Sequence, residues 1–226
     1  MIAPGIYSLD QPPLVGATGQ GIRVAIVDSG VVPSHPHVGD VAGGIHFTPS
    51  GTTADYMDRI GHGTAVAGAI REKAPDATLI AVRVFDRTLA TTAEQLAEAI
   101  EWAAREGVDL INVSLGTPNE QHRARLALAV DHAVAAGAWV VSAETREGQP
   151  MLPGSLATTI GVQADAGVAR DAIVVEAAND GRLRLRASPY PRPIPGVPVS
   201  ANLQGVSFAV ANASGFLARW RQTLPR

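Results

Sequence analysis

The chain of 226 residues contains no cysteine, which excludes disulfide bonds and thiolate chemistry. Its formal net charge is −3 and no basic block stands out, so nucleic acid and membranes are poor candidate partners. No apolar run reaches the ~18 residues that a transmembrane helix needs. The first residues, MIAPGIYSLDQPPL, lack the basic and apolar regions of a secretory signal, so we expect a cytoplasmic protein.

What the chain does contain is typical of a globular protein. Apolar residues make up 46% of the sequence and charged residues 17%. A chain of this length can bury a sizeable core, and neither a repeat nor a linker divides it. We therefore predict a single domain over residues 1–226.

Apolar runs of strand length alternate with segments of helical periodicity. Strands are expected at 23–27, 77–85, 108–115 and 139–143, and helices at 64–73, 92–106, 121–136 and 207–221. Thr91 and Glu94 fit a capping box at the start of the second helix. The strands are continuously apolar, as in a parallel sheet covered on both faces. The pattern predicts an α/β fold, a three-layer sandwich with a mostly parallel central sheet.

The pattern changes after residue 150. Asn179-Asp180-Gly181 predicts the turn of a hairpin, followed by three arginines that alternate with leucines, Arg182, Arg184 and Arg186. We interpret this ladder as a solvated strand face, with phosphate binding as the alternative. Residues 188–198, SPYPRPIPGVP, are proline-rich and expected to be irregular, either as a surface loop or as a docking segment for a partner protein.

Three residues together suggest nucleophilic catalysis. Asp28 ends the first core strand, His62 stands at the start of a helix in GHGTAVAG, and Ser207 opens the last helix. Chemistry in an open α/β sheet gathers at the carboxyl ends of the strands. A hydroxyl nucleophile needs an imidazole to take its proton, and the imidazole needs a carboxylate to fix its tautomer. Each residue alone has an ordinary structural explanation, as a turn residue, a loop histidine or a helix cap.

Four motifs, VAIVDSG, GHGTAVAG, NVSLG and GVSFA, occur in this order, and with them the chain resembles the subtilisin-like serine protease family. The order Asp, His, Ser separates this family from chymotrypsin-like proteases and α/β-hydrolases. The resemblance extends over residues 21–215. It implies a subtilisin-like fold with Ser207 as nucleophile, His62 as general acid and base, and Asp28 as its orienting carboxylate.

The resemblance also implies how a substrate is held. The backbone of Ser114, Leu115 and Gly116 would pair with an extended peptide, and Glu144 and Thr145 would stand at the pocket wall. We expect no cofactor and no metal ion, because no acidic cluster suits calcium and the histidines around Pro36 lack further ligands.

The chain departs from the family pattern at several positions. Arg146 aligns with the asparagine that the family uses in its oxyanion hole. Its guanidinium could replace that amide as a donor, or could form an exposed ion pair with Glu144 or Glu147. Ala65 stands where the family often has a bulkier residue, which would widen the space near His62. The sequence shows no stretch long enough for an inhibitory prodomain before the first motif.

Two functions of different class follow. The first is a serine endopeptidase that hydrolyses peptide bonds through an acyl-enzyme, with a dedicated substrate such as a precursor peptide in a maturation pathway. The second is a weakly active or inactive module that binds an extended peptide or a partner protein, because the oxyanion-hole asparagine is replaced. Esterase or ligase activity through the same acyl-enzyme is a smaller third alternative.

Overall fold

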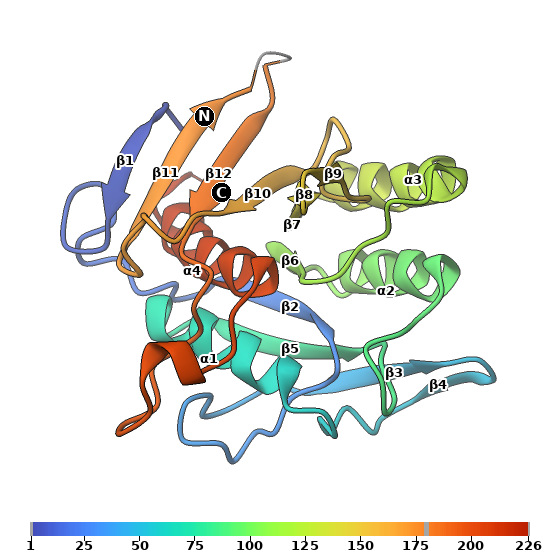
Figure 1. Ribbon diagram of the computed structural model, residues 1–226. Helices are drawn as coiled ribbons and strands as arrows, with labels where there is room; N and C mark the ends of the chain where they lie inside the picture. Colours follow the sequence, from blue (N-terminus) through green and yellow to red (C-terminus); the bar gives the residue numbers. More distant parts are fainter. Residues whose placement is uncertain (1, 179–180, 226) are drawn as a thin grey trace.

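A computed structural model describes residues 2–178 and 181–225, which form a ten-stranded sheet with helices on both faces (Figure 1). In spatial order the strands are β1 (Gly5–Ser8), β11 (Ala172–Ala177), β12 (Leu183–Ala187), β10 (Ile160–Ala164), β7 (Trp139–Ala143), β6 (Leu110–Val113), β2 (Arg23–Asp28), β5 (Thr78–Arg83), β3 (Gly44–Thr48) and β4 (Gly51–Thr53). The strands from β12 to β3 pair in parallel, and antiparallel pairs lie at the two edges. The predicted three-layer sandwich with a mostly parallel sheet is confirmed.

Helices cover the two faces of the sheet in pairs. α1 (His62–Lys73) packs against α4 (Val206–Thr223) on one face, and α2 (Ala93–Arg105) packs against α3 (Arg123–Ala135) on the other (Figure 1). Two short 3₁₀ turns, η1 (Glu120–His122) and η2 (Val199–Ala201), precede α3 and α4. Because both faces are covered, β2 is apolar from residue 24 to residue 27: Val24 and Ile26 belong to one core, and Ala25 and Val27 to the other.

Two local predictions need correction. The capping box of α2 is formed by Thr92 and Gln95, not by Thr91 and Glu94, and the Thr92 hydroxyl accepts from the Gln95 amide at 3.1 Å. The periodicity of the sequence predicts Leu126, Val130, Ala133 and Val134 on one buried face of α3; the first three are buried, but Val134 is 39% exposed. A shift of one residue along a helix rotates a side chain away from the core. The periodicity of the sequence does not determine the buried face to within one residue.

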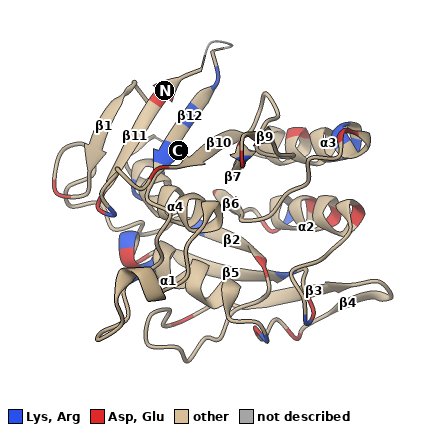
Figure 2. Cartoon of the chain, in the orientation of Figure 1, with Lys and Arg blue, Asp and Glu red and all other residues tan. Residues whose placement is uncertain are grey.

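The second half of the chain extends the sheet. β11 and β12 pair antiparallel around the predicted turn, of which Asn179 and Asp180 lie outside the described residues. β12 also pairs in parallel with β10, a strand that periodicity did not predict. The arginines of β12, marked in Figure 2, are engaged by protein groups: Arg184 donates to both carboxylate oxygens of Glu144, at 2.6 and 2.7 Å.

The topology creates a crevice at the middle of the sheet. After β2 the chain forms β3, β4 and β5 on one side of β2, and then returns past β2 to β6 and β7 on the other side. The carboxyl ends of β2 and β6 therefore meet where the strand order changes direction, which is where open α/β sheets bind ligands. Asp28 ends β2, and Ser114 directly follows β6.

The proline-rich segment runs over the start of α4 without regular structure between residues 188 and 198, as expected. The side-chain amide of Asn212 on α4 donates to the carbonyls of Ser188 and Tyr190, at 2.9 and 3.0 Å. Farther along, Ile194, Val197 and Leu203 are exposed apolar residues. Among the described residues, no helix has the length and apolarity to cross a membrane.

Candidate active site

Asp28 and His62 form a buried hydrogen-bonded pair. Asp28 is fully buried at the end of β2, and its carboxylate oxygens lie 2.8 and 3.0 Å from Nδ1 of His62. The imidazole, 16% exposed, is the first residue of α1 and faces the ring of Phe208 at a centroid distance of 5.4 Å. With Nδ1 held by a carboxylate, the other ring nitrogen is left to exchange a proton with a neighbour.

The pKa of His62 reflects two opposing effects. Burial disfavours the imidazolium and by itself lowers the pKa. The hydrogen bond and charge of Asp28, helped by the charge of Asp58, outweigh burial and raise the pKa above its ordinary value of 6.5. The pair is thus suited to stabilise the charge that His62 acquires when it accepts a proton.

A second buried carboxylate, Asp58, fixes the start of α1. It accepts from the Ser29 hydroxyl at 2.9 Å, from the Thr64 hydroxyl at 2.6 Å and from the amides of Ile60, Gly61 and Thr64 at 2.8–2.9 Å. These bonds hold the pKa of Asp58 below its usual range, although burial opposes them. The helix cap Gly61 has no capping side chain, so Asp58 supplies the anion that a helix N-terminus favours.

Gly63 lets α1 approach the turn after β2. Its amide donates to the Ser29 hydroxyl at 2.9 Å, which links the helix to the residue next to Asp28. A Cβ at position 63 would lie 2.2 Å from the Gly30 carbonyl oxygen and 3.1 Å from the Asp28 carboxylate. Only glycine permits this approach, which brings His62 within hydrogen-bond distance of Asp28.

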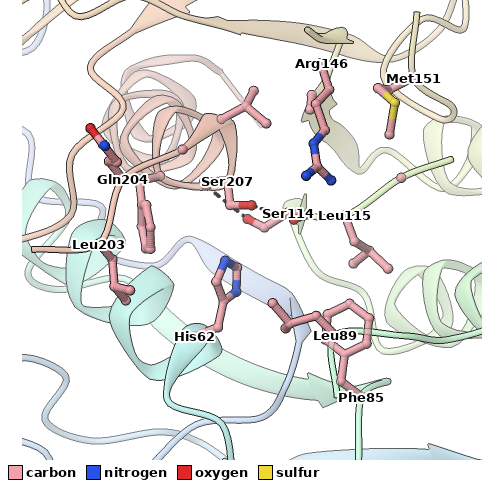
Figure 3. Close-up of a pocket in the computed structure, with 15 residues that line it drawn as sticks. His62, Phe85, Leu89, Ser114, Leu115, Arg146, Met151, Leu203, Gln204 and Ser207 are labelled. Atoms are coloured by element: carbon pink, nitrogen blue, oxygen red, sulfur yellow. Dashed lines mark hydrogen bonds between the residues drawn. The ribbon is translucent and has the colours of Figure 1, made fainter. Parts of the chain in front are cut away.

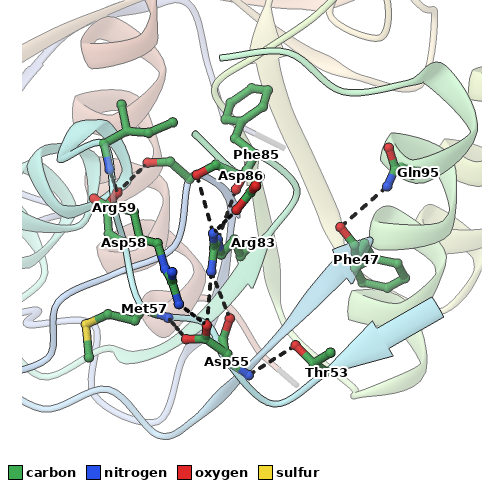
Figure 4. Close-up of polar contacts among 12 residues, drawn as sticks. Phe47, Thr53, Asp55, Met57, Asp58, Arg59, Arg83, Phe85, Asp86 and Gln95 are labelled. Carbon is green, nitrogen blue, oxygen red and sulfur yellow. Dashed lines mark hydrogen bonds and ion pairs between the residues drawn. The ribbon is translucent and has the colours of Figure 1, made fainter. Parts of the chain in front are cut away.

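The loop that carries Asp58 is itself anchored by Arg83 (Figure 4). The Arg83 side chain is 1% exposed at the end of β5. Its guanidinium donates to the carbonyls of Phe85 and Asp55, at 3.0 and 3.3 Å, and to the carboxylate of Asp86 at 2.8 Å. This network joins the 55–60 loop to the end of the sheet, so Asp58 has a fixed support.

Ser207 lies at the N-terminus of α4, on the opposite side of the crevice. As the second residue of the helix it has a backbone N–H with no intrahelical acceptor. Its hydroxyl donates to the Ser114 carbonyl at 2.9 Å, and the Ser114 hydroxyl donates to the Ser207 carbonyl at 3.2 Å. Within the described part of the chain, no hydrogen bond joins the Ser207 hydroxyl to His62.

Two fully buried polar residues support this contact from behind. The side-chain amide of Asn112 on β6 donates to the Ser114 hydroxyl at 2.9 Å, and its carbonyl oxygen accepts from the Ser214 hydroxyl at 2.9 Å. Ser214 lies two turns after Ser207 on α4. The network therefore ties the end of β6 to the helix that carries Ser207, at two levels.

His62 and Ser207 line one cavity of about 370 Å³ (Figure 3). Ser114, Leu115 and Gly116, the residues predicted to pair with a substrate, line the same cavity. The remaining lining residues are Phe85, Leu89, Ala143, Arg146, Met151, Leu203, Gln204, Gly205, Val206 and Phe208. The cavity is thus mostly apolar, with a few polar side chains, those of His62, Ser114, Arg146, Gln204 and Ser207, which is the usual composition of a small binding site.

Arg146 reaches this cavity from a tight hairpin. β8 (Thr145–Arg146) pairs with β9 (Gln149–Pro150), and the two turn residues, Glu147 and Gly148, have φ of 52° and 79°. Figure 3 shows the guanidinium pointing into the cavity. Its ion pair with Glu147, at 3.8 Å and with both side chains more than two-thirds exposed, is worth at most about 1 kcal/mol.

The structure does not bring Glu144 and Thr145 to the cavity, contrary to the expectation that they form its wall. The Glu144 side chain is 7% exposed and is directed toward Arg184 and Gln163, with the latter bond at 2.8 Å. A bend at Glu144 separates β7 from β8, so the Glu144 side chain packs against β10 and β12 while Arg146 belongs to the hairpin beyond the bend. Glu144 is therefore excluded as a partner of Arg146.

Sequence reasoning missed Asp58 and Asn112. Asp58 stands four residues before His62, and a carboxylate just ahead of a helix start is a recognisable capping signal. Asn112 interrupts an apolar strand with an amide, and a fully buried amide requires partners. Neither signal identifies its partners, because Ser29 and Ser214 are far away in the sequence.

Comparison with known proteins agrees with the geometry. The model of the subtilase family, peptidase family S8, matches residues 19–226. The chain is 35% identical to Subtilisin NAT of Bacillus subtilis subsp. natto over 93% of its length, and 34% identical to Subtilisin of Bacillus pumilus over the same share. It spans 56% of the first relative and 78% of the second.

A solved structure, Sphericase, superposes with a TM-score of 0.70 at 23% identity, covering 91% of this chain and 79% of that one. At this identity the likeness bears on the fold alone. It supports the same layered α/β architecture.

Proposed function

The chain belongs to the subtilase family, and from this premise we propose that it is a serine endopeptidase acting through an acyl-enzyme. The observation that carries the proposal is the convergence of Asp28, His62 and Ser207 from separate elements on one crevice. The chain spans about half the length of several subtilisins that it matches.

In the proposed reaction the Ser207 hydroxyl attacks the scissile carbonyl while His62 takes its proton at Nε2. The hydroxyl first turns from the Ser114 carbonyl toward the imidazole, which is a rotation about one side-chain bond. Asp28 holds Nδ1–H and stabilises the imidazolium. His62 then protonates the leaving amine, and a water molecule, activated by the same imidazole, hydrolyses the ester.

The oxyanion would be held by two donors. The first is the backbone N–H of Ser207, which the start of α4 leaves without an intrahelical acceptor. The second is the guanidinium of Arg146, which replaces the family's amide. Two facts support this role: the hairpin directs Arg146 into the cavity, and the nearest carboxylate forms only a long, exposed ion pair with it.

The substrate would be an extended peptide or protein segment. Its backbone pairs with Ser114, Leu115 and Gly116, which line the cavity beside Ser207. The narrow cavity and the replaced amide suit a dedicated peptide-maturation substrate better than general proteolysis. A cytoplasmic site of action and a partner protein at the proline-rich segment stay predictions from sequence, which cell fractionation and pull-down experiments would test.

The position of the Ser207 hydroxyl favours a second candidate function. Bonded to Ser114 and not to His62, it is also compatible with a weakly active module that binds a peptide. A fluorophosphonate probe separates the two, because it labels only a serine whose base and oxyanion donors are assembled. We expect labelling of the wild type and none of Ser207→Ala. An unlabelled but folded wild type would support the binding module.

A further inference from the structure

A second cavity, of about 510 Å³, lies beside the first. Leu203 lines both, so the two cavities meet at that residue. The second cavity is lined by Val32, His35, His37, Gly61, Thr64, Ala65, Pro191, Arg192, Ile194, Ala201, Asn202 and Leu203. The catalytic mechanism proposed above uses none of these residues.

The space exists because of small and irregular segments. Ala65, on the first turn of α1, presents only a methyl group to this cavity. The family pattern, which often has a bulkier residue here, predicts such widened space near His62. The opposite wall is the proline-rich segment, which Asn212 and the bond from Arg192 to the His37 carbonyl, at 3.0 Å, hold in place. The walls are therefore defined by interactions within the protein.

Arg192 supplies the standing positive charge of this second cavity, since burial, together with the charges of Arg192 and His35, lowers the pKa of the His37 imidazole. Among its lining residues, the side chains that can carry charge are His35, His37 and Arg192, all of them bases. The two imidazoles contact each other edge to face, with centroids 5.2 Å apart. Arg192 is half-buried and pairs with no carboxylate in the described part of the chain. A guanidinium and two imidazoles around an apolar recess complement a carboxylate on a short aliphatic stem.

The position of the cavity indicates which part of a substrate would enter it. In Figure 3, Ser114 and Leu115 lie on one side of Ser207 and His62, and Leu203 lies on the other. In the substrate orientation that we propose, the segment before the scissile bond pairs with Ser114–Gly116 and the segment after it passes Leu203. That direction leads into the second cavity.

We propose that the second cavity is a subsite for an acidic side chain, Asp or Glu, on the leaving-group side of the scissile bond. The proposal rests on the proposed peptidase function and names its substrate class. An acidic side chain, and not a terminal carboxylate, is the expected ligand because the exposed positions of His35 and Ile194 leave the cavity open for the chain to continue.

The test uses a library of proteome-derived peptides and mass spectrometry of the cut positions. With wild-type protein, we expect Asp and Glu to be enriched at one of the first three positions after the cut. For a Glu and Gln peptide pair taken from a cleaved sequence, the ratio of kcat/KM should be about fivefold, as a partly exposed charged contact gives. Equal cleavage of the pair would overturn the proposal. Amidating the peptide's C-terminus should change nothing, and loss of the preference on amidation would overturn it too.

Charge reversal supplies the decisive variant. Arg192→Glu should abolish the preference for Glu, or invert it in favour of Lys, as measured by the ratio of kcat/KM between the Glu and Gln peptides. Arg105→Glu is the matched control. Arg105 is exposed at the end of α2, near the amino ends of the parallel strands, whereas the active site lies at their carboxyl ends. Equal effects of the two substitutions would show a general charge effect and overturn the subsite.

A second readout separates this proposal from the peptidase function. The same Glu and Gln peptides, immobilised as an array, are probed with the Ser207→Ala variant, which cannot hydrolyse them. Stronger retention on Glu peptides, lost in the Ser207→Ala/Arg192→Glu variant, supports the subsite even if the wild type is not labelled by fluorophosphonate. Equal retention overturns the subsite even if the wild type is labelled.

Discussion

The hydroxyl of Ser207 and the carbonyl of Ser114 are joined by a hydrogen bond of 2.9 Å, and a second bond of 3.2 Å runs from the Ser114 hydroxyl back to the Ser207 carbonyl. The proposed nucleophile and the segment after β6 that is proposed to bind the substrate therefore hold each other in the free protein. A single neutral hydrogen bond contributes about 1 kcal/mol net, so turning the hydroxyl toward His62 is a small cost for the proposed reaction.

Replacing Arg146 tests the oxyanion donor. If its guanidinium holds the oxyanion, Arg146→Ala should lower kcat by roughly 10²–10³ with little change in KM. This range is the effect of removing an oxyanion-hole donor in another member of the family. Steady-state kinetics on a peptide cleaved by the wild type measures it. Glu147→Gln removes the long ion pair of Arg146 and is the control, with activity expected within twofold. Unchanged or increased turnover in Arg146→Ala would rule out the donor role.

The pH dependence should report the Asp28–His62 pair. His62 acts as a base only when neutral, so kcat/KM should rise with pH through its pKa, which Asp28 raises above 6.5. The acid limb of the profile is therefore expected above pH 6.5. Asp28→Asn removes the charge, so it should move that limb to lower pH and reduce kcat by roughly 10⁴. An acid limb that stays in place in Asp28→Asn would contradict the assignment.

Asp58 is expected to act as a positioning residue for His62. Asp58→Asn places an amide group among donors such as Thr64 N–H and Gly61 N–H, so some of them lose their acceptor. We expect a loss of about 2–4 kcal/mol in the free energy of unfolding. Because the start of α1 shifts, kcat should fall by about tenfold while KM changes little.

Asp55→Asn is the matched control for Asp58, because Asp55 lies in the same loop but is about half exposed. It should change stability by less than about 1 kcal/mol and leave kcat unaltered. Urea unfolding and active-site titration with a fluorophosphonate distinguish the two roles. If Asp58→Asn lowers stability alone, with normal kcat and labelling rate, Asp58 supports the fold and does not position His62.

Gly63→Ala tests the close approach of α1 to the turn after β2. The added methyl would meet the Gly30 carbonyl, so the helix must move and His62 should lose its contact with Asp28. We expect fluorophosphonate labelling to slow by at least tenfold. Gly61→Ala separates sterics from backbone strain, since position 61 has open space but a φ of 94°, and should cost about 1–2 kcal/mol. Normal labelling in Gly63→Ala would show that the approach is not required.

Glu72 should contribute to stability above about pH 4.5. Its carboxylate is bonded to Arg170, at 3.0 Å for one contact, and to Lys73; although burial opposes them, these partners lower its pKa from 4.5 to about 2. A lowered pKa means that the contribution is complete above 4.5 and is lost as the pH falls toward 2. Glu72→Gln should therefore cost about 2 kcal/mol at pH 7 and almost nothing near pH 2.

Chemical denaturation at several pH values measures this dependence. Glu120→Gln is the control, because Glu120 pairs with Arg123 on the exposed surface and its loss should leave stability nearly unchanged. A constant difference between wild type and Glu72→Gln from pH 7 to pH 2 would contradict the role of the ionised carboxylate. Lys73 should increase the difference between the two variants. Burial lowers the pKa of Lys73 to about 8, and the neighbouring Glu72 carboxylate stabilises its charged form.

Local sequence patterns predicted the core of the fold because its determinants are local. The continuous apolar run of β2 and the amphipathic period of α2 are visible without knowing their neighbours. The sequence did not predict β3 and β10. They contain Gly44 and Gly161, where neighbouring atoms occupy the space that a side chain would need, so these strands lack a continuous apolar pattern. Their place in the sheet depends on contacts with β5 and β7, which a linear pattern does not show.

The candidate site was predictable at the residues that carry chemistry and much less so at those that support them. Asp28, His62 and Ser207 stand in recognisable motifs, whereas Asp58 and Asn112 act through partners distant in sequence. The expected wall residue Glu144 shows the reverse error. Its neighbourhood in sequence suggested the pocket, but Glu144 lies at the bend after β7, where its carboxylate pairs with Arg184 on β12, a partner distant in sequence.

The packing of α1 against α4 has a consequence for how such a protein can change over time. His62 and Ser207 each stand at the first turn of one of these helices, and Gly215 lies so close to Lys73 that an added Cβ would be 2.5 Å from it. The distance between His62 and Ser207 is thus set by the packing of the two helices in the core. The residues that would meet a substrate, Arg146, Arg192 and Leu203, are on loops or a short hairpin outside that packing. Mutation can therefore redirect such a protein to new peptides while its reactive pair is passed on unaltered.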